Sequence, residues 1–428
     1  MDISPVTILL GSFLLLLILR VPVAFCLGLS SVITGIYCNV HLPMLAQAMV
    51  RGLNSFSLLA IPFFILTGEI MNEGGMSQRL IRLANALIGR YRGGLALVNV
   101  LSSMFFGGIS GSSVADTSST GAILIPMMKK KGYDADYSVA VTITASVQGI
   151  LIPPSHNMII YSLVAGGVSV SALFMAGLIP GILLGVSLMV TSYIIAVRRN
   201  YPVGEKTTMK EKVLAFKESF LGLFTFVIVV VGVIGGLYTA TEAAAVAALW
   251  AFIVTFFIYR DVPITKFPGI LKRTMKTIAI VAALISCSGI FGWMLAYLKV
   301  PAMVTAALLQ LSDNPYVILM VINLILLGLG MIMDMAPLIL ITTPILLPVA
   351  LSIGVDPVHF GIIMMLNLGT GLLTPPVGST LFVGCAIGGV SMEQMAKAMV
   401  PFYATVFIVL MIITYIPAVV MTLPKILL

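Results

Sequence analysis

The sequence is short of charged residues, cysteine and histidine. Only 9% of its 428 residues are Asp, Glu, Lys or Arg, whereas a soluble globular protein carries about 25%. Hydrophobic residues make up 60% of the chain, and no polar or Ser-rich stretch divides it. This composition excludes an ordinary soluble protein, and it predicts an all-α polytopic membrane protein with a single membrane domain over residues 1–428.

Groups that bind metals or form disulfides are equally scarce. Four cysteines and three histidines lie singly, without ligand-like spacing: Cys26, Cys38, Cys287, Cys385, His41, His156 and His359. We therefore expect no disulfide and no metal centre. The motifs HExxH and GxSxG are also absent, so neither a membrane-embedded enzyme nor a bound cofactor is predicted.

Apolar runs long enough to cross a bilayer recur along the chain. A spanning helix needs about 20 apolar residues, and ten runs qualify: 5–20, 22–40, 55–71, 137–165, 172–197, 219–237, 241–259, 277–298, 358–387 and 399–424. The first is expected to be a retained span, because Asp2 stands where a signal peptide needs positive charge. Four shorter runs are joined in pairs by Gly-rich or Asp-containing turns, which predicts re-entrant hairpins at 93–128 and 315–352.

The basic residues cluster between particular runs. If the N-terminus lies outside, almost all of them lie inside, several in a cytoplasmic linker at 201–218, and only Arg51, Lys299 and Lys425 lie outside. This arrangement agrees with the tendency of Lys and Arg to stay on the cytoplasmic side. The formal charge of +8 is therefore explained by orientation rather than by nucleic-acid binding.

The chain repeats itself under a shift of 222 residues. Equivalent pairs include Pro126 with Pro348, the double proline 153–154 with 375–376, and GGVS at 166–169 with GGVS at 388–391. Five crossings separate equivalent points, so the copies, 1–200 and 219–428, are predicted to be inverted repeats of a secondary transporter. The alternative is a gene duplication with no mechanistic meaning.

The double prolines interrupt two apolar runs at mid-depth. Proline removes a backbone donor and clashes with the preceding turn, so the runs at 137–165 and 358–387 are predicted to be broken helices. Backbone groups freed in hydrocarbon must face protein, a cation or a wet cavity. A transporter can use them as ligands.

Each break has a hairpin tip of its own repeat as its expected partner. The tips contain Ser110–Ser113 in one copy and Met333–Met335 in the other, and their hydroxyl, carbonyl and carboxylate oxygens suit sodium. Half-helix N-termini at the same depth suit a substrate carboxylate. The alternative is that the small residues here only allow close helix packing.

Four acidic residues lie within apolar runs, where charge is usually functional. Asp334, at a hairpin tip, is the candidate for a direct sodium ligand. Asp116 is expected to orient or cap a hairpin arm. For Glu69 and Glu242 we expect structural hydrogen bonds to neighbouring helices.

The motifs resemble those of the large membrane subunit of the tripartite ATP-independent periplasmic transporters. The matching stretches are SLLAIPFFILTGEIMNEGG (57–75), SGSSVADT (110–117), IPPS (152–155), LFMAGLIPG (173–181), TEAAAVAA (241–248), MDMAP (333–337) and LLTPPVG (372–378). The resemblance implies an elevator-type transporter of the bacterial inner membrane with one sodium site per repeat. It also implies two partners, a small four-helix membrane subunit and a soluble periplasmic binding protein.

The resemblance also implies a set of ligands. The sodium-binding residues would be Ser110, Gly111, Ser112, Ser113, Gly149, Pro153, Asp334, Met335, Gly371, Thr374 and Pro375. The substrate-binding residues would be Ser112, Ser155, His156, Asn157, Thr374, Gly378 and Ser379. The pair His156-Asn157 resembles the sialic-acid branch, so the expected substrate is a small organic acid, either a sialic acid or related sugar acid or a C4-dicarboxylate.

Two other functions stay open at this point. One is a sodium symporter for dicarboxylate or citrate with a related fold and no binding protein. The other is an ion channel, although two proline-broken helices with paired hairpins suit an occluding carrier better than a pore.

Overall fold

The computed structural model describes residues 4–427, and nearly all of them belong to helices. In chain order these are α1 Pro5–Ile18, α2 Val23–Tyr37, α3 Leu42–Leu53, η1 Phe56–Leu59, α4 Ala60–Glu73, α5 Met76–Ile88, α6 Gly94–Ser110, α7 Ser113–Lys130, α8 Ala135–Ser146, α9 Gln148–Leu151, α10 His156–Val164, α11 Val170–Arg198, α12 Met209–Ile234, α13 Ala240–Ile253, η2 Val254–Tyr259, η3 Ile264–Lys266, α14 Phe267–Tyr297, α15 Val300–Leu311, α16 Pro315–Gly330, α17 Met335–Ser352, α18 Pro357–Gly371, α19 Ser379–Gly388, α20 Met392–Tyr415 and α21 Pro417–Leu427. The all-α prediction is confirmed.

Fewer helices are long enough to span a bilayer than the ten runs predicted. Among the described residues seven qualify by length and composition, or eight if the bent pair α8–α9 and α10 is one span. The first two runs form helices of 14 and 15 residues, which are too short to qualify, and Arg20 adopts a positive φ of 61° in the turn between them. The run at 399–424 divides because Pro417 cannot continue α20, so α21 is a separate helix. The chain nevertheless remains a multi-pass membrane protein.

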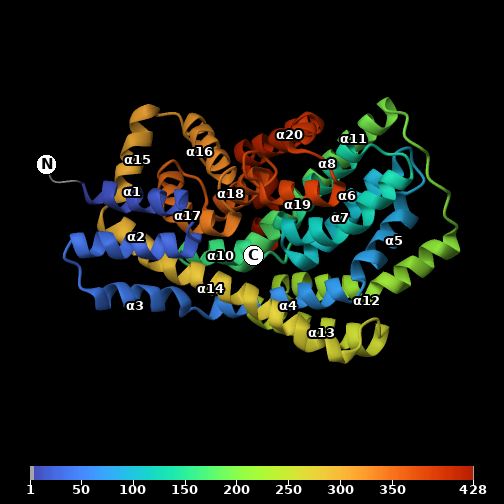
Figure 1. The fold of residues 1–428 in the computed structure, drawn as a ribbon, viewed down its shortest axis with the longest axis horizontal. Coiled ribbons are helices and arrows are strands. Elements are labelled where there is room, and N and C mark those ends of the chain that lie inside the picture. Colours follow the sequence, from blue (N-terminus) through green and yellow to red (C-terminus); the bar gives the residue numbers. More distant parts are fainter. Residues whose placement is uncertain (1–3, 428) are drawn as a thin grey trace.

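Each of the two predicted hairpin regions contains a pair of helices, and α17 in the second is among the seven long enough to span. Helices α6 and α7 make the first and α16 and α17 the second, and Figure 1 shows them on opposite sides of the centre of the molecule. The double prolines lie in non-helical segments, one between α9 and α10 and one between α18 and α19. At the first break the helix axes bend by 48°.

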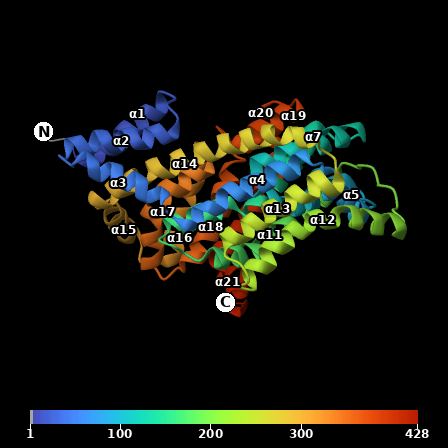
Figure 2. The same ribbon diagram turned by 90° about the horizontal axis from the view of Figure 1, so that it is seen from below.

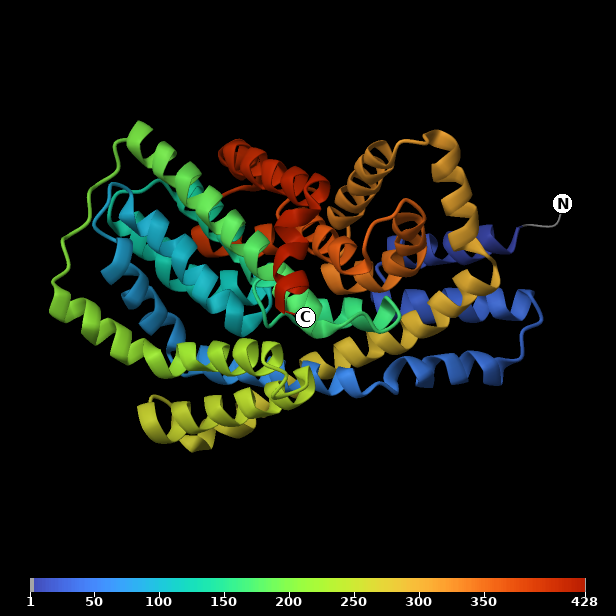
Figure 3. The ribbon, with the colours of Figure 1, turned by 180° about the vertical axis from the view of Figure 1, so that it is seen from behind.

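A layer of long helices packs beside the hairpins and the broken helices. Helix α14 packs along α2, α3 and α4, and α13 packs between α4 and α12. These helices lie along one side of the molecule in Figures 1 and 3, and Figure 2 shows α4, α12, α13 and α14 side by side. The other side contains the hairpins, the broken helices and α20.

The two copies of the repeat are interlaced in the second layer. Helix α7 of the first copy packs against α19 of the second. The Ser113 hydroxyl lies 3.1 Å from the Thr380 hydroxyl, and the Lys129 ammonium donates a hydrogen bond to the carbonyl of Gly388 over 2.9 Å. The first hairpin therefore packs against the second copy as well as its own.

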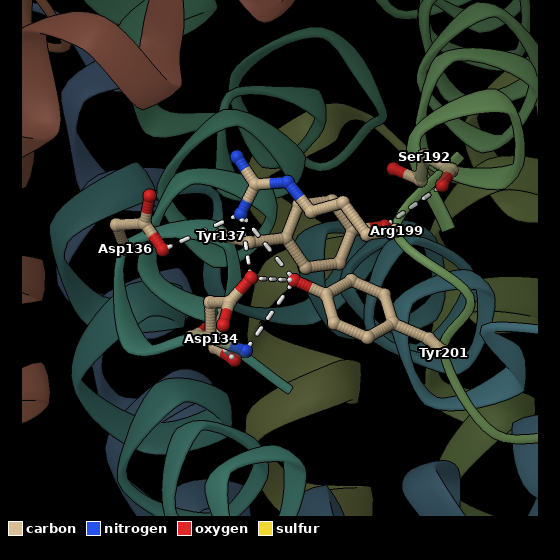
Figure 4. Close-up of polar contacts among 7 residues, drawn as sticks. Asp134, Asp136, Tyr137, Ser192, Arg199 and Tyr201 are labelled. Atoms are coloured by element: carbon tan, nitrogen blue, oxygen red, sulfur yellow. Dashed lines mark hydrogen bonds and ion pairs between the residues drawn. The ribbon is translucent and has the colours of Figure 1, made fainter. Parts of the chain in front are cut away.

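The predicted linker at 201–218 is partly helical, since α12 begins at Met209 with a capping box between Thr208 and Glu211. Its non-helical part is held against the first copy by a polar cluster, shown in Figure 4. The Tyr201 hydroxyl donates a hydrogen bond to the carboxylate of Asp134 over 2.5 Å, and Arg199 forms an ion pair with the same carboxylate over 2.8 Å. The hydrogen bond from Tyr201 lowers the pKa of Asp134, while burial raises the pKa of Tyr201 to about 12.

Candidate functional site

Pairs of glycines meet where each hairpin crosses its broken helix. A Cβ built on Gly107 would lie 2.4 Å from the Cα of Gly149, and one built on Gly371 would lie 2.5 Å from the carbonyl carbon of Gly330. The backbones are therefore in contact. At both crossings helices also end, α6 and α9 at the first and α16 and α18 at the second, so their C-terminal carbonyls lie close together.

The tip of the first hairpin lies on the first break. Gly111 has φ of +60°, and a Cβ on it would lie 2.9 Å from the carbonyl oxygen of Pro154. The carbonyl oxygen of Pro153 is 3.2 Å from a Cβ built on Gly108. Ser112 caps α7 by accepting a hydrogen bond from the backbone N–H of Ala115. The Ser110 side chain lies outside the described part of the chain.

Ser113 makes its side-chain contacts with two other helices. Its hydroxyl lies 2.6 Å from that of Ser146 and 3.1 Å from that of Thr380. These partners belong to α8 and α19, not to the break at 152–155. Ser113 thus connects the two copies of the repeat.

The second hairpin tip is closed by short polar contacts with the second break. Asp334 occupies the N-cap position of α17 but makes no capping hydrogen bond, and its carboxylate accepts a hydrogen bond from the Ser379 hydroxyl over 3.2 Å. Two residues after Pro375, the backbone N–H of Val377 donates to the Met331 carbonyl over 3.0 Å. Met335 is buried with 2% of its surface exposed. The two tips are therefore built alike but carry different polar groups.

One cavity of about 360 Å³ connects both tips with the first break. It is lined by Ile65, Gly68, Glu69, Asn72, Phe106, Ser112, Val114, Ala115, His156, Thr277, Ile280, Val281, Leu284, Asp334 and Ala336. Helices α7, α10 and α17 begin at this cavity, and the first residue of α19 contacts Asp334. Their N-termini give the cavity partial positive charge, and two carboxylates and one imidazole supply ionisable side chains.

The predicted substrate residues divide into three groups. Ser112 and His156 line the cavity, and Ser379 reaches its edge through Asp334. Ser155 and Asn157 are buried beside His156 without lining it. Thr374 and Gly378 belong to the second break, where the Thr374 hydroxyl donates to the carbonyl of Thr370 over 2.8 Å and Gly378 has φ of +40°.

The opposite wall of the cavity comes from residues that the sequence does not single out as ligands. Asn72 and Thr277 contribute polar side chains from α4 and α14. Glu69 also lines the cavity and binds Arg273 of α14 over 3.0 Å, so the expected contact with a neighbouring helix is found. Thr277, Ile280, Val281 and Leu284 share one face of α14. The sequence does not show that this face lines a cavity, because that depends on the hairpin tips that pack opposite it.

Two further acidic residues have local roles. Asp116 is fully buried in the first turn of α7, where it accepts a hydrogen bond from the Thr120 hydroxyl over 3.0 Å, consistent with orienting the hairpin arm. Glu242 closes a capping box with Thr239 at the start of its own helix, α13. The expected bond from Glu242 to a neighbouring helix is therefore replaced by a cap.

Comparisons with known proteins agree on one family. Residues 10–419 match the model of the family described as tripartite ATP-independent periplasmic transporter, DctM component. The chain is 43% identical over 425 residues to the uncharacterized protein YgiK of Salmonella typhimurium, covering 99% of this chain and 98% of that one.

Relatives with named substrates are nearly as similar. The sialic acid TRAP transporter large permease protein SiaM of Vibrio cholerae is 40% identical over 380 residues, covering 89% of both chains. The C4-dicarboxylate TRAP transporter large permease protein DctM of Pseudomonas aeruginosa is 38% identical over 400 residues, covering 93% of both chains. Among solved structures, the YdaH transporter of Alcanivorax borkumensis matches with a TM-score of 0.63 at 13% identity over 87% of both chains, a likeness of fold alone.

Proposed function

Since this chain belongs to the DctM family of tripartite ATP-independent periplasmic transporters, we propose that it carries a small organic acid across the bacterial inner membrane by coupling it to sodium. The chain is a multi-pass inner-membrane permease subunit and not an enzyme. Family membership implies a small membrane subunit and a periplasmic binding protein as partners.

The observation that supports it most is the shared cavity. Ser112 and Asp334 occupy equivalent positions in the two copies of the repeat, and both line the same hollow. Each begins the second arm of its hairpin. A binding site near the middle of the membrane, built from both repeats, is typical of secondary transporters.

Sodium is proposed to bind at the two glycine crossings. The C-terminal ends of two helices meet at each crossing, and such ends carry partial negative charge. Hydroxyl, carbonyl and carboxylate oxygens are hard ligands of the kind that sodium prefers. The first site would use the tip at 110–113 with Gly149 and Pro153, and the second would use Asp334 and Met335 with Gly371, Thr374 and Pro375.

An organic anion is proposed to occupy the cavity between these sites. The helix N-termini that face it favour a carboxylate, and His156 and Ser112 offer hydrogen bonds at the same wall. The relatives named for sialic acid and for C4-dicarboxylates are both named for acids. The adjacent Asn157 makes a sialic acid or a related sugar acid the first candidate.

Movement is proposed to be of the elevator type. The hairpins and broken helices are joined across the repeats by Ser113 with Thr380 and by Lys129 with Gly388, so they can move as one block. The layer containing α4, α13 and α14 would stay fixed. The cavity lies between the block and this layer, because Thr277 and Asn72 belong to the fixed side.

Uptake into proteoliposomes tests the proposal. The chain would be reconstituted with its small subunit and binding protein, and uptake of labelled N-acetylneuraminate and succinate would be measured with sodium or potassium outside. We expect uptake in sodium only. Asp334→Asn should raise the sodium concentration for half-maximal uptake about tenfold, as loss of one charged ligand of the ion implies.

Asp313→Asn is the matched control, because Asp313 is exposed in the turn between α15 and α16, outside the cavity. It should behave as wild type. Equal uptake in sodium and potassium would reject sodium coupling, and an unchanged sodium dependence in Asp334→Asn would reject the second ion site. Uptake without binding protein would favour the symporter of related fold instead.

A further inference from the structure

A second hollow lies along the same helices as the cavity. This outer groove, of about 390 Å³, contains Arg51, Leu163, Ser288, Gly292, Trp293 and Pro344. Helix α14 lines the cavity with Thr277, Ile280, Val281 and Leu284 and the groove with Ser288 and Gly292. Thr277, Val281, Leu284, Ser288 and Gly292 follow one another by three or four residues, so a single face of α14 runs past both hollows.

The other walls continue in the same way. Helix α17 lines the cavity near Asp334 and the groove at Pro344, and α10 lines the cavity at His156 and the groove at Leu163. The fourth wall passes from α4 to α3, which contains Arg51. The outer groove therefore lies along the same helices as the cavity, toward the end of the molecule that the charge distribution places outside.

Arg51 is the charged residue of the outer groove, and it is unpaired. Its side chain is exposed and has no hydrogen-bond or ion-pair partner among the described residues. Trp293, which stacks on Tyr297 at 5.3 Å between ring centroids, lies in the same groove. A guanidinium without a carboxylate, beside an indole, can receive an anion and the carbon skeleton attached to it.

The internal repeat shows what an arginine at this position does when acids are present. Arg273 is the equivalent of Arg51 under the shift of 222 residues. It binds Glu69 over 3.0 Å and Glu73 over 2.8 Å. The equivalents of these acids beside Arg51 are Phe291 and Leu295, so the geometry that satisfies Arg273 leaves Arg51 without a carboxylate.

We propose that the outer groove is the entry site for the transported anion, and that Arg51 binds its acidic group before it reaches the cavity. Arg273 lies at the opposite end of the same face of α14. Gly289 of α14 lies beside Gly52, next to Arg51, and at a rise of about 1.5 Å per residue it is about 24 Å from Arg273. There Glu69 and Glu73 already occupy the guanidinium, so an anion leaving on that side does not meet Arg273 as a free cation. The inference rests on the proposed transport of an organic acid.

Thiol labelling tests the charge of the groove without a substrate. A Cβ added at Gly292 meets nothing within 4 Å, so Gly292→Cys, in a chain with its four natural cysteines replaced by serine, places a thiol in the groove. Its labelling rates would be measured from outside with a sulfonate-bearing methanethiosulfonate and with the trimethylammonium analogue. We expect Arg51→Gln to lower the ratio of the two rates about tenfold, and Arg51→Lys to preserve it.

Lys299→Gln is the matched control, because it removes another positive charge predicted on the same side. It should leave the ratio of the two labelling rates unchanged. An equal ratio with and without Arg51 would overturn the inference, as would a thiol in the Gly292→Cys variant that no external reagent reaches. Ala48→Cys provides a second reporter in the groove. Protection of either thiol by phosphatidylglycerol but not by N-acetylneuraminate or succinate would identify a lipid site and also overturn it.

Uptake kinetics separate this inference from the proposed function. Arg51→Gln should raise the half-saturating concentration of loaded binding protein about tenfold, as loss of a charged hydrogen bond predicts, with the maximal rate within about twofold of wild type. If Arg51→Gln transports normally while Asp334→Asn needs more sodium for half-maximal uptake, the entry site fails and the transporter proposal stands. If the wild-type protein transports neither acid, the transporter proposal itself fails.

Discussion

Tyr201 connects the end of α11 to the start of α8 through one hydroxyl. Replacing it with phenylalanine removes the hydrogen bond to Asp134 and leaves the ion pair of Asp134 with Arg199. We expect Tyr201→Phe to reduce stability by about 1 kcal/mol at neutral pH, measured as a lower melting temperature in detergent. Tyr193→Phe, on the exposed side of α11, should have no effect.

The pH dependence of the same contact has a definite sign. The pKa of Tyr201 is raised to about 12 in the folded protein, so its contribution is complete below the ordinary tyrosine pKa of about 10 and is lost as the pH rises from there through 12. The lowered pKa of Asp134 acts at the other end, where stability is lost as the pH falls through the folded value. The alkaline loss should therefore be smaller in Tyr201→Phe, and an identical alkaline profile would contradict this assignment.

Individual site residues differ in how far the sequence can place them. The sequence singles out Ser112, His156 and Asp334, which line the cavity. It can do so because double prolines and turn residues mark interruptions in apolar runs wherever they occur. Asn72 and Thr277 cannot be found in this way. They lie within helices, and their role depends on which face of α4 and α14 packs toward the hairpins.

At the level of elements, the glycine crossings bring the backbones of two helices into contact. Gly371→Ala would place a Cβ 2.5 Å from the backbone of Gly330, where only movement of a helix can relieve the clash. We expect a loss of about 2 kcal/mol or more of stability and little uptake from the folded fraction. The outcome can be followed by thermal unfolding and by proteoliposome uptake.

Gly328→Ala is the control within the same hairpin, since a Cβ there meets nothing within 4 Å. It should be neutral or slightly stabilising, because alanine favours a helix over glycine. If both variants behave alike, close approach is not the reason for glycine at 371.

Element positions follow from the sequence more readily than element ends. The hairpins and breaks are marked by Gly, Asp and Pro, which act on the backbone locally. Helix α14 begins at Phe267, ten residues before the predicted run at 277–298. The predicted run starts late because Lys272, Arg273 and Lys276 interrupt the apolar pattern. The helix continues through them, since Arg273 is paired with Glu69 and Glu73 of α4, which are distant in sequence.

For the whole molecule, the arrangement of basic residues makes a prediction about sidedness. Lys210→Cys, at the start of α12, should be labelled by a membrane-impermeant maleimide only after cells are permeabilised. Lys299→Cys, between α14 and α15, should be labelled in intact cells. The reverse pattern would invert the topology and move Arg51 to the cytoplasmic side.

The interlacing of the two copies has a consequence for biosynthesis. Helix α7 leaves the ribosome long before Thr380 and Gly388, which are its partners through Ser113 and Lys129. The first hairpin is therefore in the bilayer without the hydrogen-bond partners of Ser113 and Lys129 in the second copy until the last quarter of the chain has been inserted. Truncation within α19 should for this reason expose the N-terminal half to quality-control proteases, even though every helix of that half is already complete.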